Sequence, residues 1–82
     1  MVRNLQSLIE EIQKADSKGQ LDNLLLGLLT PGEIEEITQR IQIMKLLKKG
    51  VGQHEIAKKL NIGVATVTRG SKELKLGRFK TI

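Results

Sequence analysis

The segment QHEIAKKLNIGVATVTRGSKEL, residues 53–74, constrains the fold more than any other part of the chain. Three apolar residues recur at helical spacing in its first half: Ile56, Ala57 and Leu60. Asn61 follows where the chain must turn, and Asn tolerates the left-handed backbone conformation better than other non-glycine residues. Val67 and Leu74 then mark the inner side of a second short helix. The segment therefore predicts a helix-turn-helix.

The outer face of the second of these helices is small, polar and basic. A helix that enters the major groove of DNA needs short side chains near its N-terminal end, and hydroxyl or guanidinium groups beside them to hold phosphates. We therefore predict contacts with double-stranded DNA from this helix and from the outer face of the one before it: Gln53, His54, Lys58, Val64, Ala65, Thr66, Thr68, Arg69, Lys72 and Lys75. An ordinary helical hairpin without DNA binding is the alternative that this pattern leaves open.

The charges of the chain are segregated. Residues 1–44 carry four basic and seven acidic side chains, a net charge of −3, whereas residues 45–82 carry ten basic and two acidic ones, a net charge of +8. The basic half contains the predicted helix-turn-helix. Positive charge gathered there is what a surface that binds a polyanion needs. For individual lysines, a solvated charged face is the alternative.

Length and composition exclude several classes of protein. A chain of 82 residues without Cys is one domain with no disulfide framework and no thiolate metal site. His54, the single histidine, has no acid or nucleophile at a useful spacing, so we do not expect an enzyme. Nothing resembles a signal peptide or a membrane span, and we expect a soluble, cytoplasmic protein. A core this small is marginal, which favours self-association.

The N-terminal half predicts two helical segments before the long helix. An amphipathic helix over residues 2–14 is indicated by apolar residues at helical spacing: Leu5, Leu8, Ile9 and Ile12. After a loop, residues 21–29 contain six Leu in nine positions. That density requires burial on nearly all sides, either in a dimer interface or in the core of a monomer.

The longest helix begins at the clearest start signal in the chain. Thr30 can cap the first turn, Pro31 suits the first helical position, and Glu33 completes a capping box. Its expected buried stripe consists of Ile34, Ile37, Ile41 and Met44. Gly50 is its expected stop. Arg40 lies among the apolar positions, either as a surface side chain at the edge of the stripe or as an arginine directed into a pocket.

These segments predict an all-α protein, a small helical domain with a C-terminal helix-turn-helix that forms an intertwined dimer. Residues 1–82 form the single domain, in which residues 1–50 are the helical dimerisation part and residues 51–75 the helix-turn-helix. Residues 76–82 form a basic tail. Phe79, the only aromatic residue, is the candidate anchor of this tail on the core.

From residue 24 to residue 74 the sequence resembles the Trp repressor family. The resemblance is carried by LLLGLLTPGE, by Arg40 with the apolar stripe that ends in LLKKG, and by IGVATVTRGSKEL. The run TRGS is the most specific part, since it is similar to the tryptophan-responsive members and unlike their ligand-independent relatives. The resemblance implies a homodimeric repressor that binds an operator in double-stranded DNA and uses L-tryptophan as corepressor.

The resemblance also implies where the ligand binds. Arg40 and Arg69 would sandwich the indole ring, because a guanidinium group stacks favourably on an aromatic face. Gly70 would leave room for the ligand. Backbone carbonyls at Gly27 and Leu29 of the other subunit would receive its ammonium group. The complete set is Gly27, Leu29, Thr30, Arg40, Arg69, Gly70 and Glu73, with Thr30 near the ligand carboxylate.

Several positions depart from the family pattern. Glu73 stands where the family places a serine that helps hold the ammonium group. The link at residues 50–52 is one residue shorter and matches the ligand-independent relatives, and the last helix of the family is replaced by the tail. Ala57 replaces a basic residue.

Two alternatives remain open, and Glu73 and the short link favour the first of them. The first is a ligand-independent DNA-binding regulator, in which Arg69 contacts a phosphate and Arg40 is a surface residue or pairs with Glu36. The second is a helical interaction module that binds an acidic protein or RNA.

Overall fold

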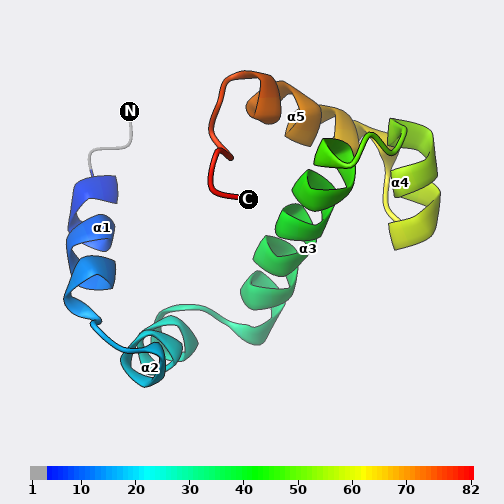
Figure 1. Ribbon diagram of the computed structural model, residues 1–82. Helices are drawn as coiled ribbons and strands as arrows, with labels where there is room; N and C mark the ends of the chain where they lie inside the picture. The colour runs from blue at the N-terminus through cyan, green and yellow to red at the C-terminus, as the bar shows by residue number, and fades with distance from the viewer. Residues whose placement is uncertain (1–3) are drawn as a thin grey trace. The chain divides into compact units, whose positions relative to one another are not determined.

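The computed structural model describes residues 4–82, and this part of the chain contains five helices and no strand (Figure 1). The helices are α1 (Leu5–Lys14), α2 (Lys18–Leu28), α3 (Pro31–Lys48), α4 (Gln53–Leu60) and α5 (Val64–Lys75). The predicted all-α class is confirmed. The first helix was expected to begin at residue 2, and residues 2 and 3 lie outside the described part.

The chain divides into two compact units, Met1–Ile34 and Glu35–Ile82, and α3 continues through the boundary between them. The predicted functional division into a dimerisation part, a helix-turn-helix and a tail stays a prediction.

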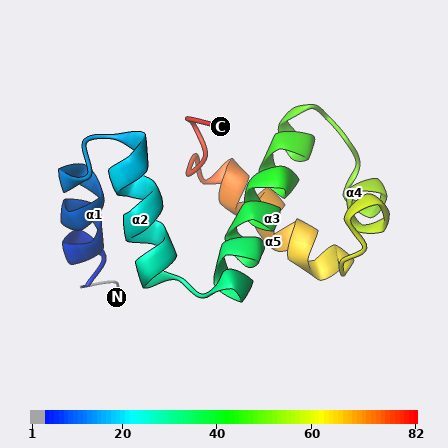
Figure 2. The same ribbon diagram turned by 90° about the horizontal axis from the view of Figure 1, so that it is seen from below.

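The first unit contains α1 and α2, joined by residues 15–17, which reverse the direction of the chain (Figure 2). The Ser17 hydroxyl caps α2 by accepting a hydrogen bond from the Gln20 N–H at 3.2 Å. Neither helix has a buried residue. Leu8 of α1 is 43% exposed and Leu26 of α2 is 67% exposed. The first unit therefore leaves large apolar side chains in contact with solvent.

Both ends of α3 follow local signals. The Thr30 hydroxyl accepts from the Glu33 N–H at 3.1 Å, and the Glu33 carboxylate accepts from the Thr30 N–H at 2.9 Å, which confirms the predicted capping box. Gly50 has a φ of +87°, which closes the last turn of α3. The Val51 N–H then donates to the Leu46 carbonyl at 3.1 Å, as in a Schellman motif.

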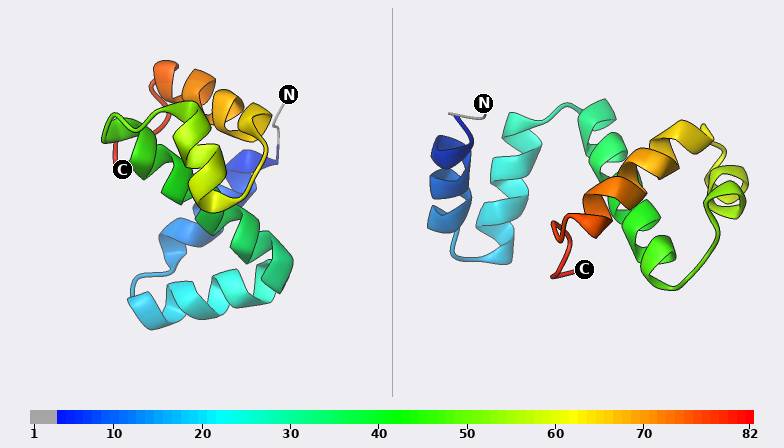
Figure 3. Two further views of the ribbon diagram at one scale, coloured as in Figure 1. Left: turned by 90° about the vertical axis from the view of Figure 1, so that its right-hand side faces the viewer. Right: turned by 90° about the horizontal axis from the view of Figure 1, so that it is seen from above.

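The core of the second unit lies where α3, α4 and α5 meet, and α5 lies across α3 (Figure 3). Its buried residues are Ile43, Met44, Ile56, Ala57 and Val67. The predicted buried stripe of α3 is wrong at two positions, because Ile37 is 40% exposed and Ile41 is 38% exposed. In this unit α5 packs on the C-terminal part of α3, so the buried side chains gather at that end.

The turn between α4 and α5 has the predicted conformation. Asn61 is left-handed, with φ 55° and ψ 52°. The Ile62 N–H donates to the Ala57 carbonyl at 2.9 Å, and the Asn61 N–H donates to the Lys58 carbonyl at 3.3 Å. These bonds use carbonyls that the end of α4 would otherwise leave unpaired. The helix-turn-helix arrangement follows from this compact corner.

Candidate functional site

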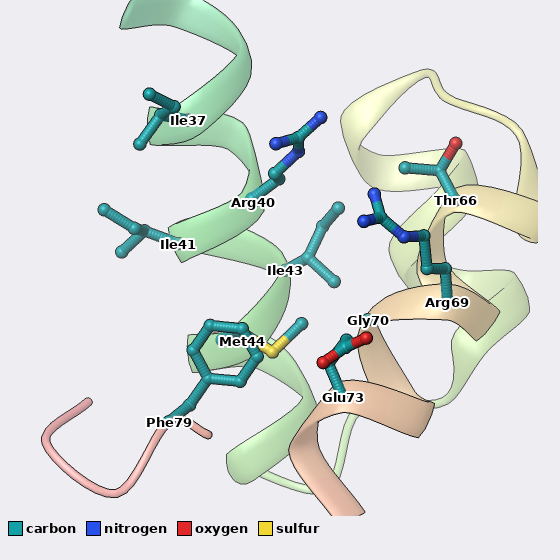
Figure 4. Close-up of a pocket in the computed structure, with 10 residues that line it drawn as sticks. All are labelled: Ile37, Arg40, Ile41, Ile43, Met44, Thr66, Arg69, Gly70, Glu73 and Phe79. Carbon is teal, nitrogen blue, oxygen red and sulfur yellow. The ribbon is translucent and has the colours of Figure 1, made fainter. Parts of the chain in front are cut away.

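A pocket of about 370 Å³ opens in the second unit between α3, α5 and the tail (Figure 4). This volume falls in the range of about 300–1,000 Å³ that is typical of small-molecule sites. Ten residues line it: Ile37, Arg40, Ile41, Ile43, Met44, Thr66, Arg69, Gly70, Glu73 and Phe79. Its walls are therefore mostly apolar, with two cationic groups and one carboxylate.

Two arginines face one another at one end of the pocket. Arg40 extends from α3 and Arg69 from α5, and both side chains are exposed (Figure 4). Among the described residues the ion pairs are Lys14–Glu11 and Arg78–Glu73, so neither pocket arginine is paired. The ion pair between Arg40 and Glu36, which the ligand-independent alternative allows, is not among the ion pairs of the described residues. Two unpaired guanidinium groups across a gap suit a flat aromatic ring or a carboxylate.

Gly70 allows α5 to approach α3 closely. A Cβ atom at this position would overlap Cε of Met44 and would lie 3.2 Å from Cγ2 of Ile43. Both of these side chains are buried. Gly70 therefore has a packing role in addition to its place on the pocket wall, and a larger side chain there would disturb the fold as well as the pocket.

The tail covers the other end of the pocket. Phe79 packs against the core, which confirms its prediction as an anchor, and its carbonyl oxygen accepts a hydrogen bond from Lys48 Nζ. Arg78 Nε lies 2.7 Å from Glu73 Oε2. The carboxylate of Glu73 is therefore already paired with a cation of the tail.

The other predicted ligand contacts belong to the first unit. Leu29 is half-buried, and Gly27 and Thr30 are exposed. The role of Thr30 near the ligand carboxylate, and that of the Gly27 and Leu29 carbonyls as groups contributed by a partner subunit, stay predictions. Sequence reasoning missed the six other pocket residues, because helical periodicity does not show where α5 and the tail pack on α3: Ile37, Ile41, Ile43, Met44, Thr66 and Phe79.

Most of the predicted DNA-contacting residues are exposed: His54, Lys58, Val64, Ala65, Thr66, Arg69, Lys72 and Lys75. Thr66 also lines the pocket. Gln53 and Thr68 are instead half-buried, and the Thr68 hydroxyl lies 2.7 Å from Gln53 Oε1 and 3.0 Å from the Val64 carbonyl oxygen. The hydrogen bond to Gln53 joins α4 to α5 and helps to hold their mutual orientation.

Comparison with known proteins shows to which family the chain belongs. The sequence model described as Trp repressor protein matches residues 3–80, nearly the whole chain. The chain belongs to the Trp repressor family. This is a regulatory DNA-binding family and not an enzyme family, so the protein is a DNA-binding transcriptional repressor, and the prediction that it is not an enzyme is confirmed.

Individual members of the Trp repressor family are similar over most of the chain. A Trp operon repressor homolog from Vibrio parahaemolyticus serotype O3:K6 is 42% identical over 74 residues, which cover 89% of this chain and 72% of the relative. The homolog from Mannheimia succiniciproducens is 46% identical over 69 residues, covering 83% and 68%. The homolog from Pasteurella multocida is 40% identical over 77 residues, covering 89% and 76%. No solved structure matches the chain significantly.

Membership of the Trp repressor family favours DNA as the partner over the acidic protein or RNA of the interaction-module alternative. None of the five described helices combines the length and apolar character needed to cross a lipid bilayer.

Proposed function

We propose that the protein is a sequence-specific repressor that binds operator DNA as a homodimer and uses L-tryptophan as its corepressor. The observation that carries this proposal is the pair Arg40 and Arg69, which face one another over an apolar pocket beside the recognition helix α5. The resemblance to tryptophan-responsive members through the run TRGS supports the same ligand.

The pocket offers a partner for each part of an aromatic amino acid. An indole ring stacked between the Arg40 and Arg69 guanidinium groups gains from the attraction between a cation and the face of a ring. Ile43 and Met44 supply an apolar floor. Arg69 is also the candidate partner of the ligand carboxylate, and Glu73 of its ammonium group.

The ligand would act on DNA binding by setting the angle between α3 and α5. Thr66 and Glu73 of α5 line the pocket, whereas Ala65 and Lys72, each one residue earlier, are turned by about 100° around the helix. A ligand that fills the pocket therefore touches the helix whose adjacent face would enter the major groove. In a dimer, two such helices must reach grooves about 34–36 Å apart, and the ligand would favour the orientation that meets this spacing.

The homodimer in this proposal is supported by the apolar surface of the first unit. Its large exposed apolar side chains are Leu5, Leu8, Ile9, Leu26 and Leu28. Surface of this kind is covered in stable proteins, and a second copy of the chain is the occupant that the family resemblance implies.

A titration of L-tryptophan into the purified protein tests the proposal. Because the chain contains no Trp or Tyr, the fluorescence anisotropy of the ligand reports binding without background. We expect saturable binding, its loss in Arg40→Ala, and a ligand-dependent shift of operator DNA by a species with the mass of a dimer. DNA binding that is equally strong with and without L-tryptophan would contradict the corepressor.

The alternative function is a ligand-independent repressor on the same fold. The ion pair between Glu73 and Arg78 favours it, because the candidate partner of the ligand ammonium is occupied. Under this alternative Arg69 contacts a phosphate, and Arg69→Ala weakens DNA binding although no ligand binds. The same titration separates the two functions.

A further inference from the structure

The tail returns to the pocket after α5 and is held there by three contacts. Arg78 pairs with Glu73, the Phe79 carbonyl accepts from Lys48 Nζ, and Phe79 packs against the core cluster that includes Met44 (Figure 4). Phe79 of the tail belongs to the pocket lining, and Arg78 of the tail pairs with Glu73, which also lines the pocket, so the tail is part of the pocket itself.

Glu73 is the only acidic residue among the ten that line the pocket. It is therefore the one lining side chain that can pair with the ammonium group of an amino acid. Its carboxylate already pairs with Arg78. An amino-acid ligand and the tail must compete for the same group.

We propose that Arg78 and Phe79 make the tail an internal competitor of the ligand, and so set the affinity of the pocket. The ligand ammonium replaces Arg78 on Glu73, and the loss of this pair loosens Phe79 from the pocket wall. The inference rests on the proposed function, since it takes an α-amino acid with an apolar side chain as the ligand class.

The expected effect is modest because the competing ion pair is partly exposed. The Arg78 side chain is 65% exposed and the Glu73 side chain 34% exposed. Exposed ion pairs of this kind change an equilibrium by about two- to fivefold. Removal of Arg78 should therefore tighten L-tryptophan binding by about this factor.

The first test compares the full chain with Arg78→Gln by the anisotropy of L-tryptophan. Lys80→Gln is the matched control, since it removes the same charge from the exposed tail without breaking the pair. Indole-3-propionate, which keeps the indole and the carboxylate but lacks the ammonium group, serves as a second probe. We expect tighter L-tryptophan binding in Arg78→Gln alone, and a smaller change for indole-3-propionate. Equal or weaker binding of L-tryptophan in Arg78→Gln would overturn the proposal.

The second test follows the tail directly. Phe79 is the only Phe, so incorporation of 4-fluorophenylalanine places a single fluorine resonance at this ring. Saturation with L-tryptophan should move this resonance toward its position in the unfolded chain, and an unmoved resonance would overturn the proposal.

The fluorine spectrum also separates this inference from the corepressor itself. If L-tryptophan binds neither the unchanged chain nor Arg78→Gln at millimolar concentration, the corepressor is wrong. The ligand-free spectra then decide whether Arg78 holds the tail. If the resonance is displaced in Arg78→Gln but not in Lys80→Gln, Arg78 holds the tail in the pocket. If both variants give the same spectrum as the unchanged chain, this role of Arg78 is overturned.

Discussion

At the scale of single residues, position 70 shows how one glycine serves two purposes. Gly70 lies in the middle of α5, where glycine costs about 1 kcal/mol relative to Ala. That cost is offset by close packing, because Met44 and Ile43 fill the space that a Cβ atom would occupy. The same close packing brings Arg69 of α5 and Arg40 of α3 to opposite sides of one pocket.

We expect Gly70→Ala to destabilise the protein by about 1–2 kcal/mol, because overpacking of the core outweighs the gain in helix propensity. The overlap involves mainly the tip of Met44, so Met44→Leu, which removes that tip, should abolish most of the cost. Urea denaturation followed by circular dichroism of the two single variants and the double variant measures this coupling. An equal cost of Gly70→Ala in both backgrounds would place the strain elsewhere.

At the scale of helices, the boundaries of α3 and α4 depend on contacts within a few residues. The capping box at Thr30 and Glu33, the left-handed Asn61 and the positive φ of Gly50 each end or begin a helix locally. The helix-turn-helix additionally uses the hydrogen bond between Gln53 and Thr68, which spans 15 residues and joins α4 to α5. Local signals thus define the helices, and longer-range contacts orient them.

Thr30→Ala should destabilise the protein by about 1 kcal/mol, because it removes the acceptor for the Glu33 N–H at the start of α3. Thr38→Ala is the matched control, since Thr38 is exposed in the interior of the same helix and Ala has the higher helix propensity. Thermal unfolding of the two variants gives the comparison. The capping role would be refuted if both substitutions had the same effect.

At the scale of the whole molecule, the segregation of charge determines how the protein meets DNA. The basic half of the chain contains the helix-turn-helix, and its predicted contact residues Lys58, Lys72 and Lys75 are exposed. Binding to phosphates releases counterions, so the affinity for DNA should fall steeply as salt concentration rises.

Lys72→Gln should lower the slope of log K against log salt concentration by about 1 for each subunit, because one phosphate contact is lost. Lys14→Gln removes the same charge from an exposed side chain of α1 in the acidic half and should leave the slope unchanged. Fluorescence anisotropy of a labelled operator duplex across a salt series measures both. Equal slopes for Lys72→Gln and the unchanged chain would show that Lys72 makes no contact with a DNA phosphate.

By itself, the sequence determined those features that depend on neighbours within a few positions. The capping box of α3, the stop at Gly50 and the left-handed turn at Asn61 are all local hydrogen-bonding or steric requirements, and each was predicted and is observed. The sequence also predicted the Trp repressor family, because the residues of the run IGVATVTRGSKEL are specific to that family.

Only the tertiary structure decided which side chains α5 and the tail cover. Ile37 and Ile41 share the apolar stripe of α3 with Met44, yet Met44 alone of these three is buried, because α5 packs at the C-terminal end of that helix. The pairing of Glu73 with Arg78 likewise depends on how the tail turns back after α5. Periodicity gives the direction of each side chain around its own helix, whereas burial depends on where a second element crosses it.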